Sequence, residues 1–560
     1  MSTTAGDGSA TAAGGVSVAV GGAARAAQAE ALAELVRDKV AGRLAGKDAT
    51  LWGEEARAEA EIRLGWIDLP SSSRALLPEL DRLAAESREA GLDHVVLAGM
   101  GGSSLAPEVI AAAYGRPLTV LDTTDPHQVR TALAERLERT VVVVSSKSGG
   151  TVETDSHRRI YEAAFREAGI DPAERIVVVT DPGSPLEAAA REAGYRVVLA
   201  DPNVGGRYSA LTAFGLVPSA LAGVDVAELL DDAAAAAATL AGDDDNPALA
   251  LGAALGGFGR AGNDKVVIAP ATGPGGAQLP GFGDWAEQLI AESTGKNGRG
   301  LLPVVVESAD APGFAPAADT HLVTVGPVGA PAAPAADTHV AGGLGGQFLV
   351  WEYATAVAGR LLEIDPFNQP NVQESKDNTN RLLAEAGDGP LSDARPLLVD
   401  GAVEVHAADA AVLGGAADLP GALAALAGAV PATGYLAVMA YLDRLGDAPA
   451  ARTRALLAER LDHPVTFGWG PRFLHSTGQY HKGGPAQGVF LQITGESAAD
   501  VAVPGRPYSL ARLQLAQALG DFGAISGRDR PVVRLHLRDR AAGLARLLAA
   551  LESVPERSAR

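Results

Sequence analysis

The spacing of apolar residues changes after the first ninety positions of the chain. Between residues 30 and 89, apolar side chains recur every three or four positions, which predicts a series of helices. Short continuous apolar runs follow, each ending in a small or polar turn, at 93–104, 140–151, 175–184 and 195–203. Helix-length segments separate most of these runs, and this alternation predicts an α/β fold with a doubly wound parallel sheet. Ligands of such sheets bind beyond the carboxyl ends of the strands, where these turns fall.

A second group of segments predicts another α/β unit. The Ala-rich run at 233–240 and the acidic run at 242–247 mark a boundary, and the apolar run at 264–271 predicts the first strand beyond it. The Pro- and Ala-rich segment 312–340 predicts a loop. It contains PAADTH twice, which we interpret as a local duplication without a structural consequence. The run at 530–539 predicts one more strand, followed by a helix.

These boundaries divide the chain into three predicted parts. Residues 1–24 are small and polar, and they predict a disordered tail. Residues 25–240 contain the N-terminal helices and the first sheet domain. Residues 241–560 contain the second sheet domain with a C-terminal extension.

Composition narrows the functional classes. With 47% hydrophobic residues, the 560-residue chain can bury a large core. The formal net charge of -22 disfavours nucleic-acid and anionic-membrane partners, which need basic surfaces, but it leaves room for a locally basic pocket. The chain has no cysteine, which excludes thiolate sites and fits a cytoplasmic location. The first 24 residues lack Lys and Arg, and no apolar run is long enough to span a bilayer, so we expect no secretory signal and no membrane segment.

The turn SSKSGGT at 145–151 is a candidate anion site. Glycines let backbone N–H groups approach an anion closely, and the N-terminus of a following helix adds positive potential. The polar side chains available there are Ser146, Lys147, Ser148 and Thr151. An ordinary helix-capping turn is the alternative. Neither this turn nor GMGGSS at 99–104 has the spacing of a P-loop or of a dinucleotide fingerprint, so a small phosphorylated molecule fits better than a nucleotide.

Five motifs, in this order along the chain, resemble the phosphoglucose isomerase family, which is built from sugar-isomerase (SIS) domains. They are GMGGSS (99–104), SSKSGGT (145–151), VGGRYSALTAFG (204–215), EQLIAESTGKNGRG (287–300) and GQFLVWEYATAVAGRLLEIDPFNQPNVQESK (346–376). The resemblance covers roughly residues 90–380 and implies two SIS-type doubly wound parallel-sheet domains, each a three-layer αβα sandwich. From about residue 440 the chain resembles the isomerase part of bacterial transaldolase–phosphoglucose isomerase fusions.

The resemblance implies roles for individual residues. Glu292, which alone reads as a carboxylate at a helix end, matches the base that moves a proton between C1 and C2 through a cis-enediol. Arg207 matches the arginine that stabilises the enediolate, and Lys376 matches the lysine near the ring oxygen. Substrate contacts are implied for Gly102, Ser103, Ser146, Lys147, Ser148, Thr151, Gln288 and Gln369.

The ring-opening histidine departs from the family's order. In the family it lies between the glutamate and the lysine, within a segment like His-Ser-x-Gly-Gln-Tyr. Here the matching segment, HSTGQYHKGG, begins at His475, after Lys376. We therefore expect a rearranged C-terminal segment and assign the role to His475, with His481 as the competing residue.

The resemblance implies a metal-independent enzyme without a cofactor that interconverts glucose 6-phosphate and fructose 6-phosphate. Its partner is a phosphorylated hexose, and a homodimer with sites near the subunit interface is implied. The alternatives are a dual phosphoglucose/phosphomannose isomerase and a non-catalytic phosphosugar-binding protein. A non-catalytic protein is expected to lose Glu292, Arg207 or Lys376, and all three are present.

Overall fold

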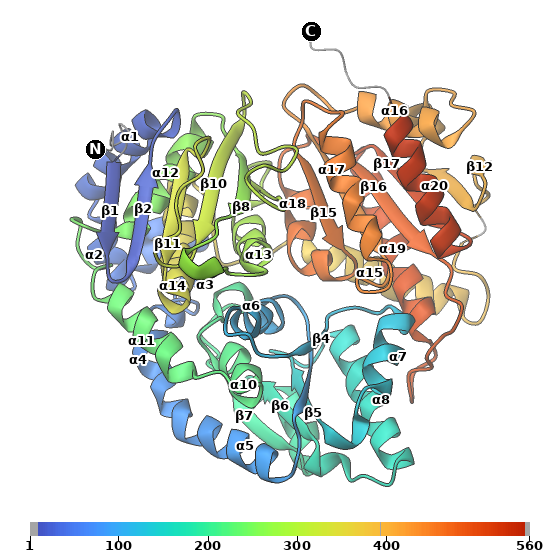
Figure 1. Ribbon diagram of the computed structural model, residues 1–560, viewed down its shortest axis with the longest axis horizontal. Helices are drawn as coiled ribbons and strands as arrows, with labels where there is room; N and C mark the ends of the chain where they lie inside the picture. Colours follow the sequence, from blue (N-terminus) through green and yellow to red (C-terminus); the bar gives the residue numbers. More distant parts are fainter. Residues whose placement is uncertain (1–8, 393, 555–560) are drawn as a thin grey trace. The chain divides into compact units, whose positions relative to one another are not determined.

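The computed structural model describes residues 9–392 and 394–554, which contain three β-sheets (Figure 1). The chain forms two compact units. The first comprises the chain up to Gln369 except for two short segments, Asp122–Glu135 and Ala311–Gly313. These segments and Pro370–Arg560 make the second unit. The first unit holds two of the sheets, so the boundary predicted near residue 240 separates two sheets within one unit.

The first sheet has the predicted doubly wound architecture. Its strands run parallel in the order β4-β3-β5-β6-β7. They are β3 (His94–Gly99), β4 (Thr119–Leu121), β5 (Thr140–Ser145), β6 (Ile176–Thr180) and β7 (Arg196–Leu199). All four predicted strands are confirmed, whereas β4 was missed because three residues give no recognisable pattern. Every residue of β3, β5 and β6 is buried, as expected for a parallel sheet covered on both faces.

Helices cover both sheets of the first unit. The segment predicted as helical up to residue 89 is confirmed, divided into α1 (Ala24–Arg37), α2 (Val40–Ala45), α3 (Glu54–Ala60), α4 (Leu69–Ser72) and α5 (Leu77–Glu89). The later helices of this unit are α6 (Leu105–Ala113), α8 (Val152–Glu167), α9 (Pro185–Glu192), α10 (Ala213–Leu221), α11 (Val226–Ala237), α12 (Pro247–Arg260), α13 (Phe282–Thr294) and α14 (Leu344–Leu361).

The second sheet corrects the prediction for the N-terminus. Its order is β1-β2-β11-β10-β8-β9. The strands are β1 (Ser9–Ala13), β2 (Val16–Val20), β8 (Lys265–Pro270), β9 (Leu302–Val305), β10 (Thr320–Gly326) and β11 (Thr338–Gly342). Because β2 pairs antiparallel with β11, the prediction of a disordered tail is wrong for residues 9–24. Residues 1–8 lie outside the described residues. Alternate valines of β2 are buried, and this period-2 pattern was hidden among small residues.

The PAADTH duplication has a structural role, contrary to the sequence-based interpretation. Each copy ends in a Thr-His pair that begins a strand, β10 in the first copy and β11 in the second. The strands are parallel neighbours, and His321 Nε2 lies 2.8 Å from Thr338 Oγ1 while His339 Nδ1 lies 2.8 Å from Thr324 Oγ1. The loop predicted for 312–340 is therefore wrong over both strands.

The second unit contains a third sheet, where the prediction placed only an extension. Its order is β12-β13-β17-β16-β14-β15. The strands are β12 (Leu398–Asp400), β13 (Val403–Ala407), β14 (Tyr435–Tyr441), β15 (Val465–Trp469), β16 (Gly488–Gly495) and β17 (Val532–Leu537). β14 to β17 are mutually parallel, whereas β13 runs antiparallel to β17. The strand predicted at 530–539 is confirmed as β17, and the helix predicted after it is confirmed as α20 (Arg540–Ser553).

The third sheet has its own hydrophobic core. One face of β13, β14, β16 and β17 contributes side chains to a cluster that is separate from the core of the first unit. The helices of this unit are α7 (Pro126–Ala134), α15 (Val372–Ala386), α16 (Leu419–Gly428), α17 (Arg452–Ala458), α18 (Thr477–Gly483), α19 (Leu510–Ser526) and α20 (Arg540–Ser553). α16, α17 and α20 pack with this core, so the C-terminal part is an independently packed α/β layer structure.

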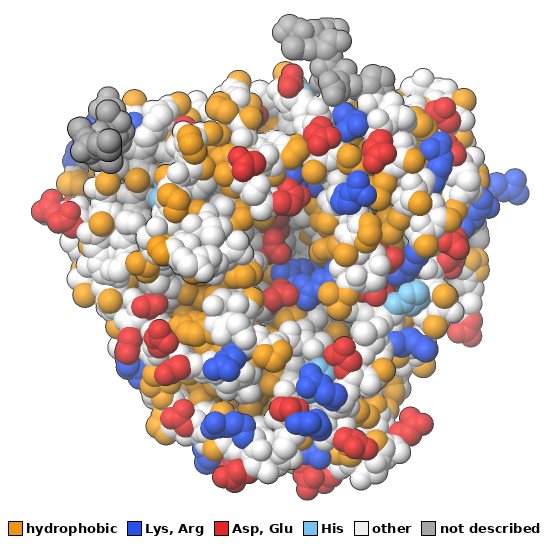
Figure 2. Space-filling model, viewed as in Figure 1, with side chains coloured by type: hydrophobic (Ala, Val, Ile, Leu, Met, Phe, Trp, Pro, Cys, Tyr) orange, Lys and Arg blue, Asp and Glu red, His pale blue; other side chains and the backbone are white. Residues whose placement is uncertain are grey.

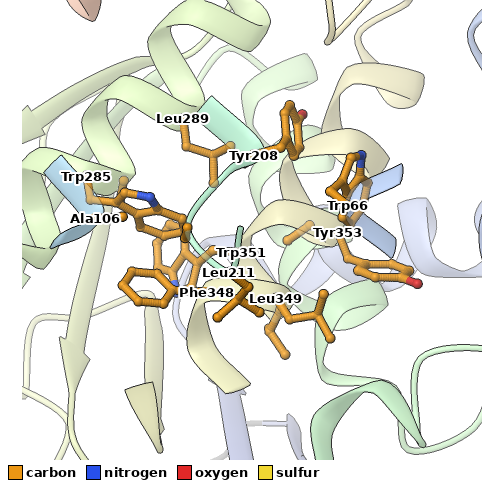
Figure 3. Packing of buried hydrophobic residues seen from close by; sticks show 14 of the residues in the cluster. Trp66, Ala106, Tyr208, Leu211, Trp285, Leu289, Phe348, Leu349, Trp351 and Tyr353 are labelled. Atoms are coloured by element: carbon orange, nitrogen blue, oxygen red, sulfur yellow. The ribbon is translucent and has the colours of Figure 1, made fainter. Parts of the chain in front are cut away.

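Two groups of aromatic side chains fix the elements that carry the candidate site. Trp285 of α13 packs edge-to-face on Phe348 of α14, with ring centroids 4.6 Å apart. Trp66 stacks on Tyr208 at 5.1 Å. Figure 3 shows both groups within one continuous core of the first unit. The turn containing Tyr208 and the helix containing Trp285 are therefore held by close packing.

Charged residues are distributed rather than concentrated on the visible surface. On the face drawn in Figure 2, acidic, basic and apolar side chains are interspersed. No helix within the described ranges is long and apolar enough to cross a membrane.

Candidate functional site

Two glycine-containing turns of the first unit approach each other closely. One follows β3 at Gly101–Ser103, and the other follows β7 at Gly206–Tyr208. A Cβ atom on Gly102 would lie 1.8 Å from the carbonyl oxygen of Gly206, so only glycine fits there. This approach places the Gly-Gly-Ser turn directly beside Arg207.

Arg207 lies beside Glu292 in a buried environment. The Nε atom of Arg207 is 3.4 Å from Glu292 Oε2, and the two side chains are 4% and 14% exposed. Gln288 lies one turn earlier on α13, and its Nε2 donates a hydrogen bond to Glu292 Oε2 at 3.2 Å. The predicted base, its predicted cationic partner and Gln288 are thus brought together, and Glu292 Oε2 both accepts from Gln288 and pairs with Arg207.

The remaining donors of Arg207 hold the chain at 366–369. Nη1 donates to the carbonyl oxygen of Pro366 at 2.9 Å and to that of Glu292 at 3.2 Å. Nη2 donates to the carbonyl oxygen of Phe367 at 3.3 Å and to the side-chain oxygen of Gln369. Arg207 therefore connects Glu292 with Gln369 and fixes its own planar fork at the same time.

Lys296 holds the same segment from a second direction. Its Nζ donates to the carbonyl oxygens of Asp365 at 2.7 Å and Asn368 at 2.6 Å, and to Asn368 Oδ1 at 2.9 Å. Burial, together with the neighbouring Arg207, lowers the pKa of Lys296 well below its ordinary value. Sequence reasoning assigned no role to Lys296; the only signal was a lysine one turn beyond Glu292.

The SSKSGGT turn is folded around Ser146. The backbone N–H of Gly149 donates to Ser146 Oγ at 3.1 Å, and Ser146 Oγ donates to Thr151 Oγ1 at 3.2 Å. Thr151 immediately precedes α8, and its side chain does not cap that helix. Lys147 is paired with Asp181, 2.5 Å from Nζ to Oδ2, where the sequence suggested only a charge offered to a ligand.

The turns after β3 and β5 lie at one edge of the first sheet. The register pairs Gly99 with Ser145, the last residues of the two strands. Gly102 and Ser103 follow one strand end, and Ser146 and the rest of its turn follow the other. The structure thus places the predicted phosphate contacts on neighbouring strand ends.

Lys376 and His475 both belong to the second unit. Lys376 is exposed on α15, and His475, which is partly exposed, lies shortly after β15. The segments that carry them are joined: Gln479 Nε2 donates to Asn371 Oδ1 at 2.8 Å, and the Asn371 backbone N–H donates to Gln479 Oε1 at 2.9 Å. Although the histidine follows the lysine in the sequence, the two segments that carry them are hydrogen-bonded to each other.

His481 occupies a different environment from His475. Its ring is 2% exposed and packs against Tyr435, Phe473 and Phe490. Burial lowers the pKa of His481 well below its ordinary value. A side chain enclosed in this way is a core residue rather than a group that reaches a substrate.

The described residues contain no cluster of three or more His, Asp or Glu side chains arranged to hold a metal ion.

Comparison with known proteins identifies the related region. Residues 86–253 match the phosphoglucose isomerase family model, which confirms the predicted resemblance for this region. A probable glucose-6-phosphate isomerase of Haloarcula marismortui is 37% identical over 219 residues, 38% of this chain and 49% of the relative. One of Natronomonas pharaonis is 36% identical over 254 residues, 44% and 57% of the two chains. The chain therefore spans about half the length of these curated relatives.

A solved structure shares the fold over a larger part of the chain. The glucose-6-phosphate isomerase of Chlamydia trachomatis superposes with a TM-score of 0.54 at 20% identity, covering 68% of this chain and 90% of that one. Together with the parallel sheets, this likeness confirms the predicted α/β fold class.

Proposed function

We propose, on the premise that residues 86–253 match the phosphoglucose isomerase family, that the protein interconverts glucose 6-phosphate and fructose 6-phosphate. The observation that carries the proposal is the buried contact between Arg207 and Glu292 beside the Gly-Gly-Ser turn. A non-catalytic protein is expected to have lost Glu292, Arg207 or Lys376. All three are present, so an enzyme is favoured over a phosphosugar-binding protein. No observation favours the dual phosphoglucose/phosphomannose isomerase.

In this proposal Glu292 transfers the proton. One oxygen of its carboxylate, Oε2, is held by Gln288 and lies near Arg207, which leaves Oε1 to remove the proton from C2 of the open-chain aldose and return it to C1. The intermediate is a cis-enediol. Arg207 stabilises negative charge on the enediolate oxygen, and its carbonyl contacts hold the guanidinium in place before substrate arrives.

The phosphate group is assigned to the two strand-end turns. Ser146, Ser148 and Thr151 offer hydroxyls, and α8 begins at the next residue with its positive end toward the turn. Gly102 and Ser103 contribute from the neighbouring strand end. Lys147 reaches a bound phosphate by exchanging its ion pair with Asp181 for one with the ligand. Anchoring the phosphate far from the reacting carbons supplies binding energy for orientation.

Ring opening is assigned to Lys376 and His475. His475 is preferred over His481 because it is partly exposed, whereas His481 is enclosed by aromatic rings. In the resembling family the histidine comes from the partner subunit, so a homodimer with shared sites belongs to the proposal. The proposal includes no cofactor, because the isomerisation exchanges no electrons with another molecule, and no metal, because Arg207 is assigned the stabilisation of the enediolate charge.

A coupled assay tests the activity. Purified protein in EDTA is expected to convert fructose 6-phosphate to glucose 6-phosphate. Glu292→Gln is expected to abolish turnover while calorimetry still detects substrate binding. Glu287→Gln, the adjacent carboxylate on α13, is the matched control and is expected to retain activity. Activity that disappears in EDTA, or full activity of Glu292→Gln, would overturn the mechanism.

Mixed dimers test the shared site. Glu292→Gln and His475→Ala chains are each expected to be inactive alone. If the histidine acts across a subunit interface, refolding equal amounts of the two chains together restores up to about a quarter of the native activity of the mixture. Half of the dimers are then mixed, and one of the two sites in each mixed dimer is intact. Absence of any regained activity, with heterodimers verified by native mass spectrometry, would contradict a site completed by the partner.

A further inference from the structure

The third sheet has the topology of a ligand-binding sheet in its own right. β15 and β16 lie on opposite sides of β14, so the chain reverses its direction of winding at the β14–β16 pair. In open α/β sheets, ligands bind outside the carboxyl ends of the strands at such a reversal. A cavity of the second unit lies there, because its lining includes Tyr441, which ends β14, and Thr494 and Gly495, which end β16.

The size of this cavity suits a small organic molecule. Its volume is about 480 Å³, within the range of ordinary ligand pockets. One wall is the sheet, and another comes from the first half of α19, including Arg512 and Gln514.

The sheet wall of the cavity is polar. A parallel strand covered on both faces is normally apolar throughout, yet the parallel strand β17 places Arg534 and His536 on this face. Its antiparallel neighbour β13 adds Glu404 and His406. The intervening valines and leucines face the hydrophobic core, so the ionisable residues share the opposite face, and all four line the cavity.

Arg534 is the strongest indication of an anionic ligand. It is 7% exposed, and its Nη1 donates one hydrogen bond, to Thr494 Oγ1 at 3.3 Å. It forms no ion pair with any residue within the described ranges, although Glu404 acts on it from a longer distance. Burial lowers the pKa of Arg534 to about 10, so the guanidinium remains charged at neutral pH. A buried charge without a counter-ion is unfavourable until an anion pairs with it.

The neighbouring groups favour hydroxyls on the same ligand. His536 connects Thr494 with Glu496, with Nδ1 3.0 Å from Thr494 Oγ1 and Nε2 3.2 Å from Glu496 Oε1. Glu404 lies 3.5 Å from His406 Nε2. These carboxylates accept hydrogen bonds from hydroxyl groups and disfavour a ligand that is anionic throughout.

We propose that the second unit carries a ligand site, distinct from the Glu292 site, for a small polyhydroxylated molecule with one oxyanion. The oxyanion pairs with Arg534, and hydroxyls are held by Glu404 and Glu496. A phosphate ester and a carboxylate share this chemistry. The proposal is independent of the isomerase activity, because none of its residues is assigned to that reaction.

Calorimetric titration of the full chain tests the site and distinguishes the two sources. Glycerol 3-phosphate represents a phosphate ester, gluconate a sugar carboxylate, and glucose the uncharged control. At least one oxyanion is expected to bind, and glucose is not. Arg534→Met is expected to weaken that binding about tenfold or more, because a charge-assisted bidentate contact is lost. Arg452→Met, an exposed arginine at the start of α17 whose ion-pair partner is Glu552, is the matched control and leaves it unchanged.

A further variant separates this site from the first unit. Lys147→Met removes the cation of the SSKSGGT turn, and the binding that is weakened in Arg534→Met is expected to persist in it. If Lys147→Met abolishes binding while Arg534→Met preserves it, or if neither oxyanion binds, the proposal is wrong. Should Arg534→Met not fold, Thr494→Val removes only the hydroxyl beside the guanidinium, and binding about threefold weaker is expected. Unaltered binding in folded Thr494→Val would then contradict the assignment.

Discussion

Each unit of the molecule buries an arginine, and the two are satisfied differently. Arg207 in the first unit is 4% exposed and donates to several carbonyl oxygens around Glu292. Arg534 in the second unit is 7% exposed and donates to one hydroxyl. Burying a guanidinium is costly in both cases, but of these two only Arg207 has that cost offset by backbone carbonyl oxygens. Arg207 therefore organises the surrounding backbone, whereas Arg534 lacks hydrogen-bond acceptors for most of its donors among the described residues.

The two arginines also differ in whether their side chains are held in place before a ligand binds. The first unit holds Arg207 in place before a ligand arrives, which is what electrostatic stabilisation of a transition state requires. In the second unit Arg534 lines a cavity and donates one hydrogen bond, as is typical of a binding site whose ligand completes the interactions.

The same substitution at both arginines gives the largest expected difference. Arg207→Met leaves buried carbonyl oxygens without donors, so we expect the free energy of unfolding of the first unit to fall by about 3–5 kcal/mol. Arg534→Met replaces an uncompensated buried charge with an apolar chain, so we expect no loss in the second unit, or a gain of about 1 kcal/mol. Hydrogen exchange read by mass spectrometry measures both, because peptides report each unit separately.

Activity measurements provide the control for this pair. Arg207→Lys keeps the charge but not the planar fork, and we expect kcat to fall by about 10²–10³-fold. Arg534→Met is expected to keep the native kcat in the absence of added oxyanion. If Arg207→Met and Arg534→Met lowered the free energy of unfolding equally, the proposed difference between the two arginines would be wrong.

Two glycines of the first unit sharpen the argument about Arg207. An added Cβ at Gly102 would meet the Gly206 carbonyl oxygen at 1.8 Å, whereas one at Gly206 would meet nothing within 4 Å. We expect Gly102→Ala to cost about 3 kcal/mol of stability and most of the activity, because the Arg207 turn must move. Gly206→Ala is the matched control and should change the melting temperature little. A tolerated Gly102→Ala would show that the two turns need not touch.

Lys296 tests whether the segment at 365–369 must be held from both directions. Lys296→Met removes donors from the carbonyl oxygens of Asp365 and Asn368, and we expect kcat to fall about tenfold to a hundredfold with a smaller change in KM. The reason is that Gln369, which Arg207 contacts, loses its fixed position. Partial recovery in Lys296→Arg is expected for a positioning residue. A native kcat in Lys296→Met would limit the organising role to Arg207.

The sequence predicted the first sheet well because each strand is a continuous apolar run with a polar end. It failed at β2, where small residues conceal a period-2 pattern, and at β10 and β11, where proline and alanine between the strands suggested a loop. Both failures have one cause: pairing with a distant strand, which local composition does not show, decides the structure there.

The candidate site divides in a similar way. The face shared by Gln288 and Glu292 follows from helix periodicity, and so it was predictable. The contacts of Lys296 and the cavity beside Arg534 were not, because they depend on which backbone carbonyls and which strands come together in space. The alternation in β17 was visible as Arg534 and His536 between apolar residues, but only the sheet order shows that His406 and Glu404 join them.

The smallest expected effect compares a histidine from each unit under acid. Burial lowers the pKa of His321 to about 3 and that of His406 to about 4. The unfolded chain then binds more protons than the folded one below about pH 6.5, so stability is full above that pH and is lost as the pH falls toward those values.

At pH 5 we expect His321 to cost the first unit about 2 kcal/mol relative to pH 7.5, and His406 to cost the second unit less, because its ring borders an open cavity. His321→Gln and His406→Gln should each reduce the pH dependence of its own unit alone, by the contribution of that histidine, measured by hydrogen exchange at the two pH values. If either variant altered the pH dependence of both units equally, the two regions would unfold together and the comparison between them would lose its meaning.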